Sequence, residues 1–230
     1  MAMRIEDLRN GDNGNTTSIL KKNAQDTLNQ AVKIGNLDWA RQAIEEGADI
    51  HYNDERPLRW AVEHNNIDIV KYLIENGADV HARDNEALCT SALSYDTDIL
   101  EYLVEQGVDI HAQDDAALKI AAGKGNIDTV KYLVEHGANI NAKGYPVLSQ
   151  AVSAGHLDIV KYLIENGADV HARDDEALKI AKSKRRSGIV RYLTERSDQN
   201  TLSSDELVIQ NISTEELLRE LERRGVKVEV

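Results

Sequence analysis

The sequence predicts an all-α solenoid of about six helix–turn–helix repeats, followed by a small C-terminal strand–helix–strand appendage. Three observations carry this prediction. Glycine, leucine and tyrosine each recur every 30 residues through most of the chain. Between the recurring glycines, apolar residues follow helical spacing in two short stretches per unit. Neither stretch can bury its apolar face alone, so neighbouring units must stack into one continuous core.

The period of 30 residues is visible at several positions of the unit. The glycines are Gly47, Gly77, Gly107, Gly137 and Gly167. The tyrosines are Tyr72, Tyr102, Tyr132, Tyr162 and Tyr192, each followed by a leucine. A further leucine recurs at Leu28, Leu58, Leu88, Leu118, Leu148 and Leu178. The predicted units cover 27–196 and are divided at 27–56, 57–86, 87–116, 117–146, 147–176 and 177–196.

Each unit is predicted to hold two helices joined by a tight turn. In the second unit, Leu58, Ala61 and Val62 lie on one helical face, and the apolar residues of 67–74 form a second stripe. Gly77 follows that stripe, where a left-handed residue ends a helix most easily. The polar residues that follow form a short connector to the next unit.

Composition excludes several classes of protein. The chain has 230 residues, a formal net charge of −13 and 41% hydrophobic residues, which is typical of a folded domain. Its single cysteine can form neither an internal disulfide nor a cysteine-based metal site. No apolar run is long enough to span a membrane, and we expect no secretory signal and a cytoplasmic location. The negative charge argues against direct nucleic-acid binding.

The repeat resembles the ankyrin repeat. The residues that carry the resemblance are Gly-Ala-Asp-Val-His after the second helix and Gly-His-Leu-Asp-Ile-Val at 155–160. The family period is about 33 residues, and its Thr-Pro-Leu-His signature survives here only as Pro57-Leu58. The missing residues fall where the family forms a β-hairpin finger. The resemblance therefore implies shortened fingers with little or no strand, and Asp84, Asp114 and Asp174 are candidates to cap the helices that follow.

The 30-residue form also resembles ankyrin proteins of large DNA viruses. That resemblance implies a host protein as the partner, which the chain would inhibit or sequester in the host cytoplasm.

The two ends depart from the repeat. Residues 1–26 are predicted to be a flexible segment or cap, with a loop at Asn10–Thr17 and a helix capped by Thr17 or Asn23. A polar linker is expected at 197–206, and 207–230 has the pattern of strand, helix and strand. This last segment is too small to fold alone, so it either caps the solenoid or drives self-association.

No arrangement of residues indicates catalysis, a metal or a cofactor. Stacked helices lie about 8–10 Å apart, too far for His51, His81, His111 and His171 to share one ion. Their repeat position favours hydrogen bonds within the turn. Cys89 is expected to be a packed thiol, and the paired acids of the connectors to be solvated. We therefore expect no enzyme activity.

Large residues that break the repeat are the candidate partner-binding residues. In a solenoid the periodic residues hold the core, so aperiodic ones on the connectors and first helices are available for recognition. They are Tyr52, Arg56, Arg59, Trp60, His64, Leu93, Tyr95, Lys143, Tyr145 and Pro146. Acidic connector residues form a candidate second feature, an acidic edge that includes Asp84, Glu86, Asp114 and Asp115. Trp39 is expected to pack beside the core instead.

The predicted function is that of a non-enzymatic scaffold for protein–protein interaction. It would bind one partner protein, with a basic surface if the acidic edge takes part, through the concave face and connectors. One alternative is an acidic nucleic-acid mimic that occupies a basic groove in a nucleic-acid-processing protein. The others are a ligand-sequestering protein and a structural homo-oligomer formed through 207–230.

Overall fold

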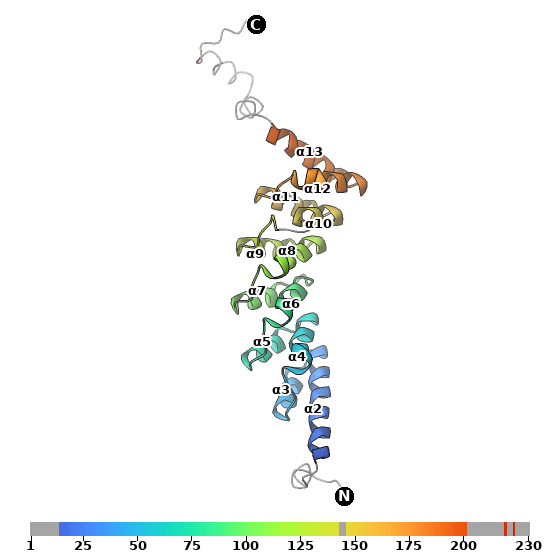
Figure 1. The fold of residues 1–230 in the computed structure, drawn as a ribbon, viewed down its shortest axis with the longest axis vertical. Coiled ribbons are helices and arrows are strands. Elements are labelled where there is room, and N and C mark those ends of the chain that lie inside the picture. Colours follow the sequence, from blue (N-terminus) through green and yellow to red (C-terminus); the bar gives the residue numbers. More distant parts are fainter. Residues whose placement is uncertain (1–13, 143–145, 202–218, 220–222, 224–230) are drawn as a thin grey trace.

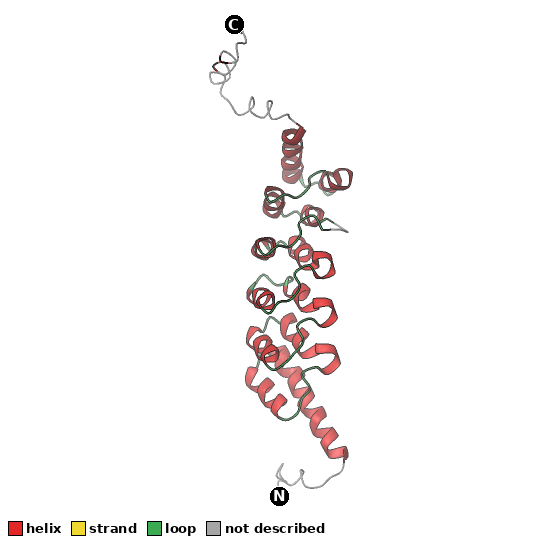
Figure 2. Ribbon diagram, turned by 60° about the vertical axis from the view of Figure 1, so that its left-hand side comes forward, coloured by secondary structure: helices red, strands yellow, loops and turns green. Residues whose placement is uncertain are grey.

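A computed structural model describes residues 14–142 and 146–201, together with Arg219 and Arg223. These residues contain twelve helices and no strand, which confirms the all-α solenoid (Figures 1 and 2). The first helices of the units are α2 (Gly14–Ile34), α4 (Tyr52–Glu63), α6 (Ala82–Ser91), α8 (Ala112–Lys124), α10 (Val147–Ala154) and α12 (Ala172–Ser183). The second helices are α3 (Leu37–Glu45), α5 (Ile67–Glu75), α7 (Asp98–Glu105), α9 (Ile127–Glu135), α11 (Leu157–Glu165) and α13 (Ser187–Thr201).

First and second helices form two parallel columns along the long axis of the molecule (Figure 1). Successive first helices contact one another more extensively than successive second helices do, so the column of first helices is the more closely packed. The core lies between the columns. The leucines after the repeated tyrosines, Leu73, Leu103, Leu133, Leu163 and Leu193, are all fully buried. Burial of each such side chain stabilises the fold by about 1.5–3 kcal/mol.

Both ends of the described region contain more helix than the sequence predicts. At the N-terminal end, α2 begins at Gly14 and passes through Thr17 and Asn23 without a break, so the expected cap is wrong, as is the expected loop over 14–17. Residues 10–13 of that loop lie outside the described residues. Ala24 is buried and extends the apolar stripe of this helix toward its start. At the other end, α13 continues to Thr201, beyond the expected start of the linker. Ser197 stands where other second helices are followed by a glycine, so no left-handed residue ends the helix there.

The predicted strand–helix–strand segment at 207–230 lies outside the described residues except for two arginines. Arg219 and Arg223 are both helical.

The connectors form one turn of left-handed helix, which the sequence did not predict. Residues 53–55, 83–85, 113–115 and 173–175 all have φ between 51° and 60°. Non-glycine residues disfavour this conformation by roughly 1–2 kcal/mol each, least so for Asn and Asp. The second residue of each of these turns is an aspartate, and the third is Glu, Asn or Asp. This left-handed turn stands in place of the finger and changes the direction of the chain within three residues.

The capping role expected for the connector aspartates is wrong. The carboxylates of Asp114 and Asp174 instead accept hydrogen bonds from Lys119 and Lys179, at 2.6 Å in both cases. The lysine of Asp174 holds the pKa of that carboxyl below its usual range, through its hydrogen bond first and its charge second.

Histidine side chains form hydrogen bonds inside the left-handed turns, as expected for their repeat position. The Nδ1 atoms of His81 and His111 lie 3.0 Å from side-chain oxygens of Asn85 and Asp115, four residues on. Asp115 is buried, and its Oδ1 also accepts the backbone N–H of Asn139 in the turn after α9, at 2.8 Å. The same link at the N-terminal end uses Gln25, whose Oε1 accepts the N–H of Asp49. These buried side chains therefore link each first helix to the turn that follows its second helix.

The turns between first and second helices are joined in a similar way. Asn66 donates to the carbonyl of Val32, Asn126 to that of Ser94, and Arg186 to that of Ala154. Each donor belongs to one unit and each acceptor to the unit before it. Gly155 allows one of these close approaches, because a Cβ at that position would lie 2.6 Å from Arg186 Cζ.

Two glycine substitutions separate backbone strain from crowding between units. Gly77 and Gly155 have similar φ values, 101° and 96°, but a Cβ at Gly77 meets nothing within 4 Å. We expect Gly77→Ala to lower the free energy of unfolding by about 1 kcal/mol or more through strain alone. Gly155→Ala should lose at least about 1 kcal/mol more, because it also displaces the hydrogen bonds of Arg186. Urea unfolding followed by circular dichroism measures both, and equal losses would contradict this packing of the turns.

The first connector should make stability depend on pH. The hydrogen bond and charge of Glu55 raise the pKa of His51 above its ordinary value of 6.5. The pair therefore adds stability below that value, and the addition is lost as the pH rises through the raised pKa. We expect the wild type to exceed His51→Gln in stability by more at about pH 5.5 than at about pH 8. His81→Gln, whose ring faces the uncharged Asn85, is the control. A stability difference between the wild type and His51→Gln that does not change with pH would contradict this explanation.

Candidate functional site

Trp60 and two cations form the most distinctive surface feature of the first helices. Trp60 is half-buried on α4 and packs against the core. The guanidinium of Arg56, one turn earlier on α4, lies 3.8 Å from the ring centroid, and Lys33 Nζ of α2 lies 4.1 Å from it. Among the described residues, neither cation has a carboxylate oxygen within 4.0 Å. We call Lys33, Arg56 and Trp60 the Trp60 cluster.

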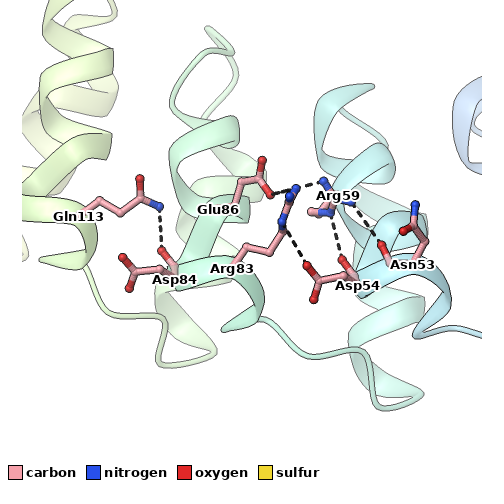
Figure 3. A network of polar contacts seen from close by, with 7 residues as sticks. All are labelled: Asn53, Asp54, Arg59, Arg83, Asp84, Glu86 and Gln113. Atoms are coloured by element: carbon pink, nitrogen blue, oxygen red, sulfur yellow. Dashed lines mark hydrogen bonds and ion pairs between the residues drawn. The ribbon is translucent and has the colours of Figure 1, made fainter.

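Arg59 faces the connectors and is already engaged (Figure 3). Its guanidinium donates to the carbonyls of Asn53 and Asp54 and to Glu86 of the next unit, at 3.1–3.4 Å. Arg59, a candidate partner-binding residue, thus holds the connector at the start of α4 in place.

Arg83 extends this network in both directions along the connectors (Figure 3). It pairs with Asp54 at 3.1 Å and with Glu86 at 3.0 Å. Gln113 of the following connector donates to the carbonyl of Asp84 at 3.0 Å. These contacts hold the connectors of three units in register.

The predicted acidic edge is therefore largely neutralised. Asp54 and Glu86 are paired with arginines, and Asp114 with Lys119. Asp115 is only 4% exposed and its Oδ1 is used within the connectors, so it is not part of an accessible surface. Asp84 is exposed. We expected the paired acids of the connectors to be solvated. This expectation is wrong for Asp115, because its carboxylate is buried and accepts a backbone hydrogen bond inside the protein.

The predicted residues near the helix turns lie close to one another. Asn65, next to His64, donates to Asp96, next to Tyr95, at 3.1 Å. Tyr95 is 73% exposed, and its hydroxyl donates to the carbonyl of Lys124 in the next unit. Leu93 is 49% exposed in the same turn, two residues after the end of α6. The turns of units two to four thus present an exposed leucine and tyrosine on a fixed backbone.

The exposed face of the first helices follows a simple rule of neighbours. A residue on one first helix lies beside the residue 27 positions later on the next, as Lys33 does beside Trp60 and Gly123 beside Gln150. Leu93 and Ile120, which is half-buried on α8, hold the repeat positions of Lys33 and Trp60. Ile120 was not among the candidate residues selected from the sequence.

The remaining candidates are distributed as follows. Tyr52 is 40% exposed and lines a cavity of about 550 Å³ with Gln25 and Asp49. Lys143 and Tyr145 lie outside the described residues. Pro146 is half-buried and precedes α10. Trp39 on α3 is 49% exposed, so its expected packing is wrong: the apolar face of α3 is filled by the small residues Ala40 and Ala43.

The second helices present a different surface. There a cation of one unit lies over the repeated tyrosine of the next. The pairs are Arg41 with Tyr72, Lys71 with Tyr102 and Lys161 with Tyr192. Burial first, and then the charges of Glu75 and Glu105, raise the pKa of Tyr102. This face repeats from unit to unit and is acidic.

Groups with catalytic or metal-binding chemistry do not converge on either face. Among the described residues, no three His, Cys, Asp or Glu side chains lie together in a way that could hold a metal ion. Cys89 is buried, and burial raises the pKa of its thiol, which disfavours the nucleophilic thiolate. No described helix is long and apolar enough to cross a membrane.

Comparisons with known proteins agree with this architecture. The family profile described as ankyrin repeats in three copies matches residues 5–84, 88–174 and 143–205. Solved structures that match include the ankyrin repeat domain of Bcl-3, a member of the IkappaB family. That match has 27% identity and a TM-score of 0.62, and covers 74% of this chain and 85% of the other. No curated protein matches the sequence. The two-column stack and the family match together show that the chain belongs to the ankyrin repeat family, whose repeats generally serve as protein–protein interaction modules.

Proposed function

We propose that the chain is a non-enzymatic protein-binding module that recognises a partner through α4, α6 and the turns that follow them. The surface comprises Arg56, Trp60, His64, Leu93 and Tyr95. Tyr52 extends it toward the N-terminal end of the stack.

One observation carries the proposal. Six large apolar side chains are exposed in the described residues, and three of them are aperiodic: Tyr52 at the start of α4, and Leu93 and Tyr95 in the turn after α6. Exposing such side chains has no benefit for folding, and tyrosine, tryptophan and arginine are the residue types that dominate interface energies. The internal hydrogen bond of Tyr95 holds its ring in place before binding, which lowers the entropy lost on association.

The other functions lack such an observation. A nucleic-acid mimic needs unpaired carboxylates along the connectors, whereas Asp54, Glu86 and Asp114 are paired with cations. The cavity beside Tyr52 could hold a small ligand, but the carbonyl oxygen of Gln25 is occupied by Asp49. Self-association through 207–230, a host factor as the partner and a cytoplasmic location stay predictions.

Truncation of the surface should abolish binding without unfolding the chain. We expect the triple variant Trp60→Ala, Leu93→Ser and Tyr95→Ala to lower affinity for a captured partner by at least about 30-fold, the loss expected for one hot spot. The measurement is affinity capture from cells, with partners identified by mass spectrometry and titrated against each variant.

Trp39→Ala is the matched control, because it removes the chain's other tryptophan from a second helix. It should leave affinity unchanged. A partner that binds the folded triple variant as tightly as the wild type would refute the assignment of this surface.

A further inference from the structure

We propose that the surface of α4, α6 and α8 binds an acidic and aliphatic segment of a partner protein. Carboxylates of the segment would lie beside Lys33 and Arg56, and aliphatic side chains beside Leu93 and Ile120. This inference rests on the proposed function and reverses the charge expected from the sequence, which pointed to a basic partner.

The Trp60 cluster supplies the acidic preference. An aromatic ring attracts cations by its quadrupole, worth about 0.5–1 kcal/mol at exposed sites, but it neutralises neither charge. Lys33 and Arg56 therefore hold two positive charges beside one ring with no described carboxylate in contact. A carboxylate that arrives here gains charge-assisted hydrogen bonds and relieves the repulsion between the two cations.

Four other cations of this face are already paired with carboxylates. Arg59 and Arg83 share Glu86, and Lys119 and Lys179 pair with aspartates of their own connectors. Lys33 and Arg56 are two cations of this face that lie over one ring and have no described carboxylate oxygen within 4.0 Å.

The neighbouring helices supply the aliphatic preference. Beyond α4, an uncharged strip comprises Thr90 on α6, Leu93 in the turn after α6, Ala116 and Ile120 on α8, and Gln150 on α10, with the paired Lys119 beside it. Leu93 is half exposed, and it holds the repeat position of Lys33, as Ile120 holds that of Trp60. An uncharged strip next to a cationic end fits a segment that is acidic at one end and aliphatic at the other.

Helix spacing sets the distance between the two parts of that segment. Packed helices lie about 8–10 Å apart, so α4 and α8 are separated by about 20 Å. An extended chain advances about 3.3 Å per residue, so acidic and aliphatic residues should be about six positions apart.

The negative charge of the chain does not oppose this binding. Exposed glutamates recur at the ends of the second helices, as at Glu75, Glu105, Glu135 and Glu165. Their influence on the repeated tyrosines places the negative potential on the second-helix face. Physiological salt screens charges beyond about 8 Å, so local contacts at the Trp60 cluster decide the preference.

A displayed library of random peptides provides the test. The full chain should select peptides rich in Asp and Glu at one end and in Leu, Ile or Val about six positions away. Binding is measured as the fluorescence anisotropy of a labelled peptide, which also reports on variants that lack Trp60. The charge reversal Lys33→Glu with Arg56→Glu should weaken binding by at least about tenfold and change the selected peptides from acidic to basic.

The control is Lys71→Glu with Lys161→Glu, which makes the same change in net charge at two lysines that lie over tyrosines of the second-helix face. It should bind the acidic peptides as the wild type does. Circular dichroism confirms that each variant is folded.

The outcomes distinguish the two proposals. Peptides that need Trp60 and Leu93 but show no acidic bias would overturn the acidic partner and leave the binding surface intact. Selected peptides whose binding survives Trp60→Ala and Leu93→Ser would overturn both, as would a library from which nothing is enriched. Equal losses in the two charge-reversal variants would overturn the role of the Trp60 cluster.

Discussion

Burial of each helix against the next unit is the interaction on which the whole molecule depends. Leu73, Leu103, Leu133, Leu163 and Leu193 are fully buried only because a neighbouring unit covers them. Helices of eight to thirteen residues, which make up most of the stack, are marginal when isolated in water, so tertiary contact supplies their stability. The core is therefore a line and not a sphere. Its length, set by the number of units, leaves one long surface of first helices open to solvent.

The sequence was sufficient for the architecture, because periodic leucines and glycines encode stacking directly. It could not predict the connectors. Nothing in the pattern of Arg83, Asp84 and Asn85 distinguishes a polar loop from a left-handed turn, since both tolerate Asp and Asn. The extent of α13 depended on Ser197, where the missing glycine removes the usual stop. In each case the outcome depends on local backbone energies that composition does not reveal.

The candidate surface was predictable in its residues but not in its charge. Trp60, Leu93 and Tyr95 break the repeat and could be selected on that ground alone. Whether a charged residue is free depends on contacts between units, and these appear only in three dimensions. Asp115 looked like a surface acid and is buried, while Arg59 looked free and is engaged. Lys33 belongs to the first unit and became part of the surface only through its contact with Trp60.

The central claim is that partners bind on the first-helix face and leave the second helices uncovered. Hydrogen–deuterium exchange on the full chain, alone and with a selected peptide or captured partner, tests it most directly. Our account predicts slower exchange in segments that cover 56–64 and 90–95, and unchanged exchange in 67–75 and 157–165. Slower exchange confined to the second helices would contradict it.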